Sequence, residues 1–146
     1  MATIKRFEDL EAWQLSSELS KSIFQLTKKE GFNKDYKLKD QINDASGSAM
    51  DNIAEGFGRG GRNEFVNFLS VTNGSLNEVK SQLYRALDRE YISQNEFDTM
   101  YQLAENATGK TVNSIKYLNS STHSGTKFKD RTASKSTAPN NSKPKT

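Results

Sequence analysis

Residues 62–90 read RNEFVNFLSVTNGSLNEVKSQLYRALDRE, and they carry the longest and most regular apolar pattern of this 146-residue chain. Apolar and small residues recur there every three or four positions, which is the spacing of one helix face. That face comprises Phe65, Phe68, Leu69, Thr72, Leu76, Val79, Leu83, Ala86 and Leu87. Gly74 lies inside this predicted helix, where glycine costs about 1 kcal/mol relative to alanine. We therefore expect another helix to approach closely at Gly74.

Two further helices are predicted before this one. The first covers residues 9–29, with Asp9 as its N-cap and Gly31 as its stop signal. The second begins near Asp35 and is expected to end at a run of four glycines. These glycines are at positions 56, 58, 60 and 61. Both segments have apolar residues at three-to-four spacing, so each should bury one face.

A fourth helix is predicted after residue 93, where Ser93-Gln94-Asn95-Glu96 matches a capping box. Its apolar stripe comprises Phe97, Met100, Tyr101, Ala104, Thr111, Ile115 and Leu118. No segment alternates with the period of two that marks a strand. Short connections make consecutive helices antiparallel. The pattern therefore predicts an all-α fold, an antiparallel up-down-up-down four-helix bundle.

Composition narrows the chemistry. The chain has no Cys and a single His, His123, so it offers no disulfide, no thiolate nucleophile and no Cys-based zinc site. No apolar run approaches the roughly 18 residues of a membrane helix, and no charged-then-apolar leader opens the chain. We expect a soluble cytoplasmic protein with one folded domain, without a cofactor and without a membrane partner.

The charge is unevenly distributed along the chain. Residues 120–146 are rich in Ser and Thr and hold both prolines, so we predict a disordered tail there and a folded domain at residues 1–119. Six basic residues against one acidic residue give the tail a charge of +5. They are Lys127, Lys129, Arg131, Lys135, Lys143 and Lys145. The body then keeps 15 basic and 17 acidic residues, a net charge of −2.

The glycine-rich turn at residues 56–62 has two interpretations. Glycines before a helix, flanked by Arg59 and Arg62, could cradle a phosphate. A P-loop or a dinucleotide fingerprint needs a preceding strand, however, and a helix precedes this turn. A helix stop followed by a tight turn is therefore the favoured interpretation.

Polar residues run beside the apolar stripes of the second and third helices. They are Gln41, Ser48, Asn52 and Glu55 on one helix, and Glu64, Ser75, Glu78 and Gln82 on the other. They predict either a buried hydrogen-bonded seam that fixes helix register or a solvated edge. A carboxylate metal site would use Glu55, Glu64 or Glu78, but bundle di-iron sites need Glu-x-x-His motifs and the body has no His. We expect no catalytic residues and no metal.

Trp13 and Phe24 form a second apolar strip on the first helix. Core or subunit contacts are the simplest interpretation of such a strip, and a bundle helix with two strips often uses one of them for self-association. We therefore predict Trp13 and Phe24 as an oligomer interface.

Three segments carry a resemblance to a known family. They are FEDLEAWQLSSELSKSIFQLT at 7–27, LKDQINDASGSAMDNIAEGFGR at 38–59 and EFVNFLSVTNGSLNEVKSQL at 64–83. The chain resembles, over about residues 7–118, the bacterial four-helix-bundle proteins known as 23S ribosomal RNA intervening-sequence proteins. The resemblance implies a homopentamer, a ring of five bundles, without known enzymatic activity.

The same family is structurally akin to the accessory variability proteins of diversity-generating retroelements, which assist a reverse transcriptase and bind nucleic acid. Two departures stand out. Asn43-Asp44 occupies the place of an Arg-Arg pair that many members have after Gln-Ile, which weakens an RNA-binding surface there. Glu90 stands where the family tends to have Gly, which should alter only a helix end.

The leading hypothesis from these features is a non-catalytic oligomeric scaffold. It would bind RNA, DNA or a nucleoprotein through Arg59, Arg62 and the tail lysines. An accessory subunit of a retroelement reverse transcriptase is the alternative, and a carboxylate-metal hydrolase is the third. Several weak contacts repeated around a ring would add through avidity.

Overall fold

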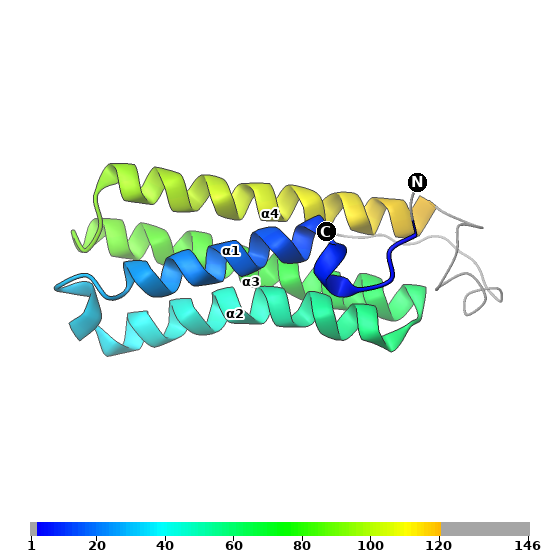
Figure 1. Ribbon diagram of the computed structural model, residues 1–146. Helices are drawn as coiled ribbons and strands as arrows, with labels where there is room; N and C mark the ends of the chain where they lie inside the picture. Colours follow the sequence, from blue (N-terminus) through cyan, green and yellow to red (C-terminus); the bar gives the residue numbers. More distant parts are fainter. Residues whose placement is uncertain (1–2, 121–146) are drawn as a thin grey trace.

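The computed structural model describes residues 3–120, which form four long helices and two short 3-10 helices. The long helices are α1 (Glu11–Leu26), α2 (Tyr36–Arg59), α3 (Arg62–Asp88) and α4 (Gln94–Ser120). The 3-10 helices are η1 (Phe7–Asp9) and η2 (Phe32–Lys34). Consecutive long helices run antiparallel, with the α1–α2 and α3–α4 connections at one end of the bundle and the α2–α3 turn at the other (Figure 1). The predicted four-helix bundle is confirmed.

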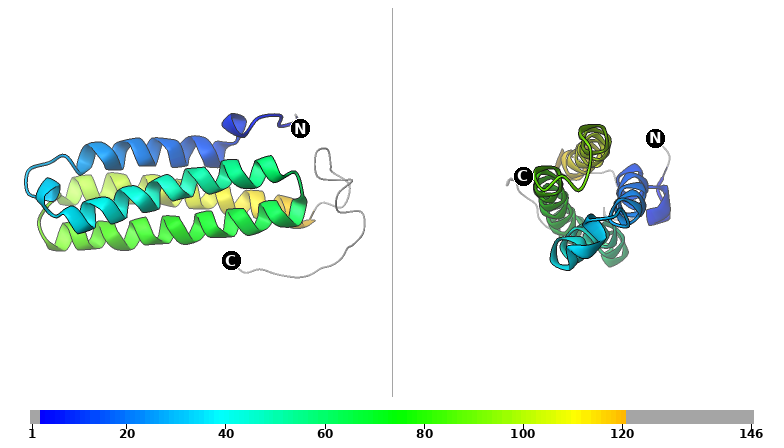
Figure 2. Two further views of the ribbon diagram at one scale, coloured as in Figure 1. Left: turned by 90° about the horizontal axis from the view of Figure 1, so that it is seen from below. Right: turned by 90° about the vertical axis from the view of Figure 1, so that its left-hand side faces the viewer.

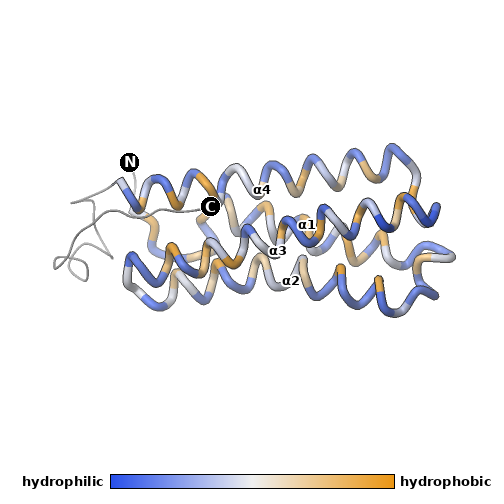
Figure 3. The backbone as a smooth tube through the Cα atoms, turned by 180° about the vertical axis from the view of Figure 1, so that it is seen from behind, coloured by the Kyte–Doolittle hydropathy of each residue, from blue (hydrophilic) through white to orange (hydrophobic). Residues whose placement is uncertain are grey.

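The helices surround one core. α1 packs on α2 and α4, α3 packs on the same two helices, and the view along the bundle shows the four around a common centre (Figure 2). Hydrophobic residues recur at intervals along each helix, separated by hydrophilic ones, as the three-to-four spacing predicts (Figure 3). No helix within residues 3–120 is both long enough and apolar enough to cross a membrane.

Two apolar clusters make up the core, and a layer of small hydroxyl residues separates them. The larger cluster includes Phe32 and Leu83 near the α1–α2 end, and the smaller includes Phe57 and Phe65 near the α2–α3 turn. Where the helices pass from one cluster to the other, α1, α3 and α4 present fully buried Ser16, Thr72 and Thr111. A polar layer in a bundle core can specify helix register.

The structure corrects one expected helix cap. Asp9 is not the N-cap of α1, because it lies in η1, and Leu10 occupies the cap position without a side-chain cap. Packing determines the start of α1 instead. The rings of Phe7 and Trp13 meet edge to face with their centroids 5.2 Å apart, and Leu10 packs on the smaller apolar cluster. Asp35 does cap α2, since its Oδ1 accepts a 3.1 Å hydrogen bond from the Leu38 N–H.

The glycines of the α2–α3 turn have separate roles. α2 continues through Gly56 and Gly58 to Arg59, and only Gly60, at φ 85°, provides the left-handed end of the helix. A Cβ at Gly56 would lie 2.5 Å from Phe68 Cβ, so this is where α2 and α3 need glycine for close approach. Gly74 is exposed, and apart from its chain neighbours and the backbone of its own helix, no atom of the described residues lies within 4 Å of its would-be Cβ. The expected close approach at Gly74 is therefore wrong for the described residues.

Candidate nucleic-acid interface

Of the two arginines that the sequence singles out at the glycine-rich turn, Arg59 makes two contacts within the bundle. The Arg59 Nε–H donates to Glu55 Oε2 at 2.9 Å, one helical turn earlier, and its guanidinium lies 5.1 Å from the centre of the Phe68 ring. Arg62 is the first residue of α3 and is partly buried. Other ion pairs join neighbouring helices: Lys80 on α3 pairs with Glu105 on α4 at 3.1 Å, and Lys110 on α4 pairs with Glu11 on α1 at 2.8 Å.

A different group of cations gathers at the α1–α2 connection. Residues 21–39 hold six lysines and two carboxylates, a net charge of +4 within a body of net charge −2. Five of these lysines form no ion pair within 4.0 Å among the residues that the structure describes. We call them the lysine corner: Lys21, Lys28, Lys34, Lys37 and Lys39. The first four are exposed, and Lys39 is partly buried.

The sixth lysine anchors this connection to α4. Lys29 Nζ donates to Glu96 Oε1 at 2.6 Å, and the same carboxylate oxygen accepts from the Ser93 N–H at 2.9 Å. The Ser93 hydroxyl in turn accepts from the Glu96 N–H at 3.1 Å, so the predicted capping box is formed. The hydrogen bond from Lys29 and then that from Ser93 lower the pKa of Glu96.

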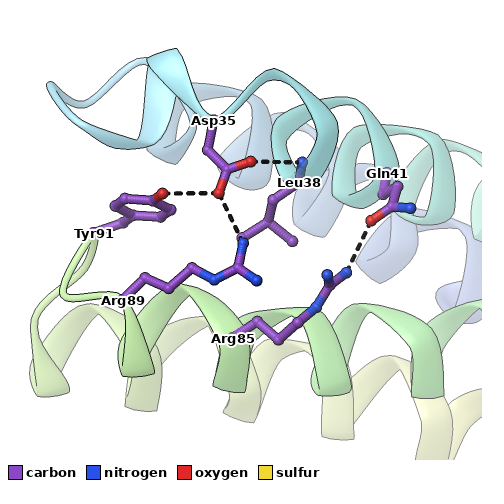
Figure 4. A network of polar contacts seen from close by, with 6 residues as sticks. All are labelled: Asp35, Leu38, Gln41, Arg85, Arg89 and Tyr91. Atoms are coloured by element: carbon purple, nitrogen blue, oxygen red, sulfur yellow. Dashed lines mark hydrogen bonds and ion pairs between the residues drawn. The ribbon is translucent and has the colours of Figure 1, made fainter.

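Asp35 provides a second anchor, between α2 and the α3–α4 connection (Figure 4). Its Oδ2 accepts from the Tyr91 hydroxyl and from Arg89 Nη1, both at 2.8 Å. The hydrogen bond from Tyr91, then that from the Leu38 N–H, hold the pKa of Asp35 below its ordinary value, and the same contact raises the pKa of Tyr91. The Tyr91 ring stacks on buried Phe32 at 5.3 Å. Asp35 thus fixes the connection that bears the lysine corner.

One further contact extends this polar network along α2 and α3. Arg85 Nη2 donates to Gln41 Oε1 at 2.9 Å, one turn beyond the Asp35 contacts (Figure 4). The charges that face inward at this end of the bundle are therefore paired across helices. The lysine corner, four of whose five members are exposed, lies on and beside a connection that is held in place by Lys29 and Asp35.

Some of the predicted polar residues of α2 and α3 are buried or partly buried between the helices, and others are exposed. Ser75 on α3 donates to Ser48 Oγ on α2 at 3.0 Å, and Asn52 Nδ2 donates to the same Oγ at 3.0 Å, so these three side chains meet. Gln82 is 6% exposed, and its Oε1 has no hydrogen-bond partner within residues 3–120. The three carboxylates are all exposed: Glu55, Glu64 and Glu78.

The exposed carboxylates bear on the metal hypothesis. Within residues 3–120, no group of three or more His, Cys, Asp or Glu residues is arranged to hold a metal ion. Glu55 is already occupied by Arg59 at 2.9 Å.

The two aromatic residues predicted at an oligomer interface lie in different environments. Trp13 is partly buried against Phe7 and the smaller apolar cluster. Phe24 is 51% exposed near the end of α1. The six basic residues predicted in the tail lie outside the described residues, namely Lys127, Lys129, Arg131, Lys135, Lys143 and Lys145.

The sequence interpretation missed the lysine corner and the Asp35 network. The net charge of the whole body, −2, conceals a segment of charge +4 at residues 21–39. A window of 19 residues with six lysines was the available signal. The partners of Asp35 are 54 and 56 residues away along the chain, so no local pattern links them.

Comparisons with known proteins agree with this architecture. A family model described as 23S rRNA-intervening sequence protein matches residues 8–114. A solved structure, described as a protein with unknown function from the S23 ribosomal protein family of Bacteroides thetaiotaomicron, is similar with a TM-score of 0.64. That alignment has 20% identity and covers 72% of this chain and 98% of the other, so it supports the fold alone. No curated protein matches the sequence.

Proposed function

Because this chain belongs to the 23S rRNA-intervening sequence protein family, we propose that it is a non-catalytic oligomeric scaffold that binds nucleic acid by electrostatic contact. The lysine corner is the observation that carries the proposal. Five lysines that form no ion pair within residues 3–120 lie on or beside a connection that Lys29 and Asp35 hold in place. A polyanion would gain these contacts without breaking an ion pair, since the inward charges keep their own partners.

An oligomer would bind more tightly than a single chain, because it carries several copies of the binding surface. The resemblance implies a ring of five bundles, and each copy would contribute one lysine corner and one basic tail. Individually weak contacts to phosphates add when they are linked on one particle. Light scattering of the full-length chain measures the subunit number, for which we expect five.

Charge reversal in the lysine corner tests the proposal. K34E/K37E replaces two exposed lysines of the corner, and K5E/K116E makes the same charge change at two exposed lysines elsewhere on the described body. Neither pair of lysines takes part in an ion pair among residues 3–120, so both variants should fold as the parent does. We expect K34E/K37E to weaken RNA binding at least about tenfold at low salt, and K5E/K116E to weaken it much less.

Fluorescence anisotropy with a fluorescein-labelled RNA, titrated between about 50 and 200 mM salt, provides the measurement. Binding should weaken steeply with salt, and the logarithmic slope should become shallower in K34E/K37E. A full-length variant with the six basic tail residues changed to Gln measures the tail contribution separately. Equal losses in the two charge-reversal variants would contradict a specific role for the corner.

A reverse-transcriptase partner remains the alternative proposal and rests on the resemblance alone. A neighbouring gene for such an enzyme with a template repeat would favour it. Co-purification of that enzyme with K34E/K37E, whose RNA contacts are reduced, would show a protein contact that does not depend on nucleic acid.

A further inference from the structure

Two aromatic rings stand exposed beside the lysine corner. Phe24 is 51% exposed and Tyr36 is 67% exposed, although both lie next to the connection that closes the core at this end. Lys28 Nζ lies 4.7 Å from the centre of the Phe24 ring, and Lys39 Nζ lies 5.3 Å from the centre of the Tyr36 ring. Each ring is therefore presented to solvent with a cation at its face.

The lysines of the corner flank both rings along the chain. Lys21 and Phe24 lie three residues apart on α1, which places them on one helix face, and Lys28 follows in the turn after α1 with its Nζ over the Phe24 ring. Tyr36 opens α2, with Lys34 before it and Lys37 directly after it. Rings alternating with cations on one surface are the pattern that single-stranded nucleic acid recognises, because bases stack on rings while phosphates pair with ammonium groups.

We infer that the lysine corner binds single-stranded nucleic acid, with unpaired bases stacking on Phe24 and Tyr36 and the lysines contacting the flanking phosphates. This inference rests on the proposed function and deepens it. A duplex keeps its bases stacked inside and offers only phosphates, so it would use the lysines without the rings. The two rings therefore select unpaired strands.

Charge opposes a second copy of the chain as the occupant of this surface. A symmetric contact would place the lysines of one corner against those of its partner copy. The acidic residues nearest in sequence are Glu18, Glu30 and Asp40, together with Asp35, which is occupied by Arg89 and Tyr91. These leave the corner in excess positive charge, which suits a polyanion.

Removal of the rings without removal of charge tests the inference. F24L/Y36L keeps apolar side chains of moderate size at exposed positions, so the fold and the charge are preserved. The probes are a fluorescein-labelled 12-nucleotide oligo(U) and a labelled 12-base-pair RNA duplex, measured by anisotropy at one low salt concentration. We expect the parent chain to bind oligo(U) at least about fivefold tighter than the duplex, and F24L/Y36L to lose at least about fivefold for oligo(U) and less than about twofold for the duplex.

Two matched controls accompany this variant. Tyr36→Phe keeps the ring and should retain oligo(U) binding within about twofold. Tyr117→Leu removes a tyrosine of 51% exposure on the last turn of α4, and it should leave binding unchanged.

The outcomes separate the inference from the proposed function. If F24L/Y36L binds oligo(U) as the parent does while K34E/K37E is weakened, the corner is a purely electrostatic surface and the inference is overturned while the proposed function stands. If F24L/Y36L lowers the subunit number in light scattering, Phe24 or Tyr36 belongs to a subunit contact and the inference is likewise overturned. If the parent chain binds neither probe at low salt, both are overturned.

Discussion

The hydroxyl of Tyr91 donates a 2.8 Å hydrogen bond to Oδ2 of Asp35, joining the α3–α4 connection to the first turn of α2 (Figure 4). The same carboxylate caps α2 through the Leu38 N–H and pairs with Arg89 at 2.8 Å. One side chain therefore links three segments at the end of the bundle that bears the lysine corner. Its charge state should control how firmly that end is held.

Acid should weaken this end of the bundle through Asp35. Because its contacts lower the pKa of Asp35 in the folded state, the ionised carboxylate stabilises the fold at pH values above its ordinary pKa of 3.8. This contribution is lost as the pH falls from there through the lowered pKa of the folded state. Asp35→Asn can still cap α2 but has no charge. Urea unfolding of both proteins between pH 7 and pH 3 should show a constant gap in unfolding free energy above about pH 5 that closes below about pH 4.

A second variant identifies the contact responsible. Tyr91→Phe removes the largest cause of the lowered pKa, so its acid-dependent loss of stability should be smaller than in the parent chain and should end at a higher pH, while the onset, which the unfolded chain sets, stays the same. Glu96 also has a lowered pKa and is common to all three proteins, so it cancels from the differences. A gap between parent and Asp35→Asn that persists unchanged to pH 3 would contradict this role of the carboxylate.

Glu90 should be replaceable by glycine with a gain in stability. The Tyr91 N–H bonds to the Ala86 carbonyl and the Glu90 N–H to the Leu87 carbonyl, which is the Schellman ending of α3. Glu90 occupies its left-handed position at φ 61°, where a Cβ is unfavourable. We expect Glu90→Gly to raise the free energy of unfolding by about 0.5–1 kcal/mol, after allowance for the greater entropy of the unfolded chain.

Glu90→Ala is the matched control, because alanine removes the carboxylate and keeps the Cβ. It should stay within about 0.5 kcal/mol of the parent chain. An equal gain in both variants would assign the effect to charge at the helix end rather than to backbone conformation.

The helices and their order could be predicted because each apolar stripe is local in the sequence. Three-to-four spacing from Phe65 to Leu87 needs no knowledge of the partner helix, and the Asp35 and Ser93 caps act within one turn. The N-cap prediction at Asp9 failed because packing of Phe7 and Leu10, rather than capping, determines where α1 begins.

The candidate interface could be predicted only in part, because pairing depends on partners that are distant in sequence. Arg59 was prominent in the sequence, yet Glu55 and Phe68 occupy it. Lys29 and Lys28 are adjacent, and only the position of Glu96 on α4 distinguishes the paired lysine from the one left without an ion pair among the described residues. Which cations face outward is therefore a property of the assembled bundle.

Two substitutions in the polar layer between the apolar clusters should change the free energy of unfolding in opposite directions. Thr72 Oγ1 donates to the Ala49 carbonyl at 2.9 Å, so Thr72→Val should lower the free energy of unfolding by about 1 kcal/mol. Ser16 Oγ is buried without a hydrogen-bond partner among the described residues, so Ser16→Ala should raise it by about 1 kcal/mol. Urea unfolding checks both, and a loss in Ser16→Ala as large as in Thr72→Val would show that its hydroxyl is satisfied in solution.

Replacement by alanine should change the free energy of unfolding in opposite directions at two glycines that lie inside helices. A Cβ at Gly56 would lie 2.5 Å from Phe68 Cβ and 3.0 Å from Phe65 Cδ1, and Phe68 Cβ is too near the backbone to move aside. Gly56→Ala must therefore push α2 and α3 apart, and we expect a loss of about 1–3 kcal/mol in the free energy of unfolding. Gly74→Ala meets open space in the middle of α3, so it should gain about 0.5–1 kcal/mol from helix propensity. Thermal unfolding of the two variants beside the parent gives the comparison. A loss in Gly74→Ala together with a lower subunit number in light scattering would instead reveal a close approach by another copy at Gly74, which the single chain does not show.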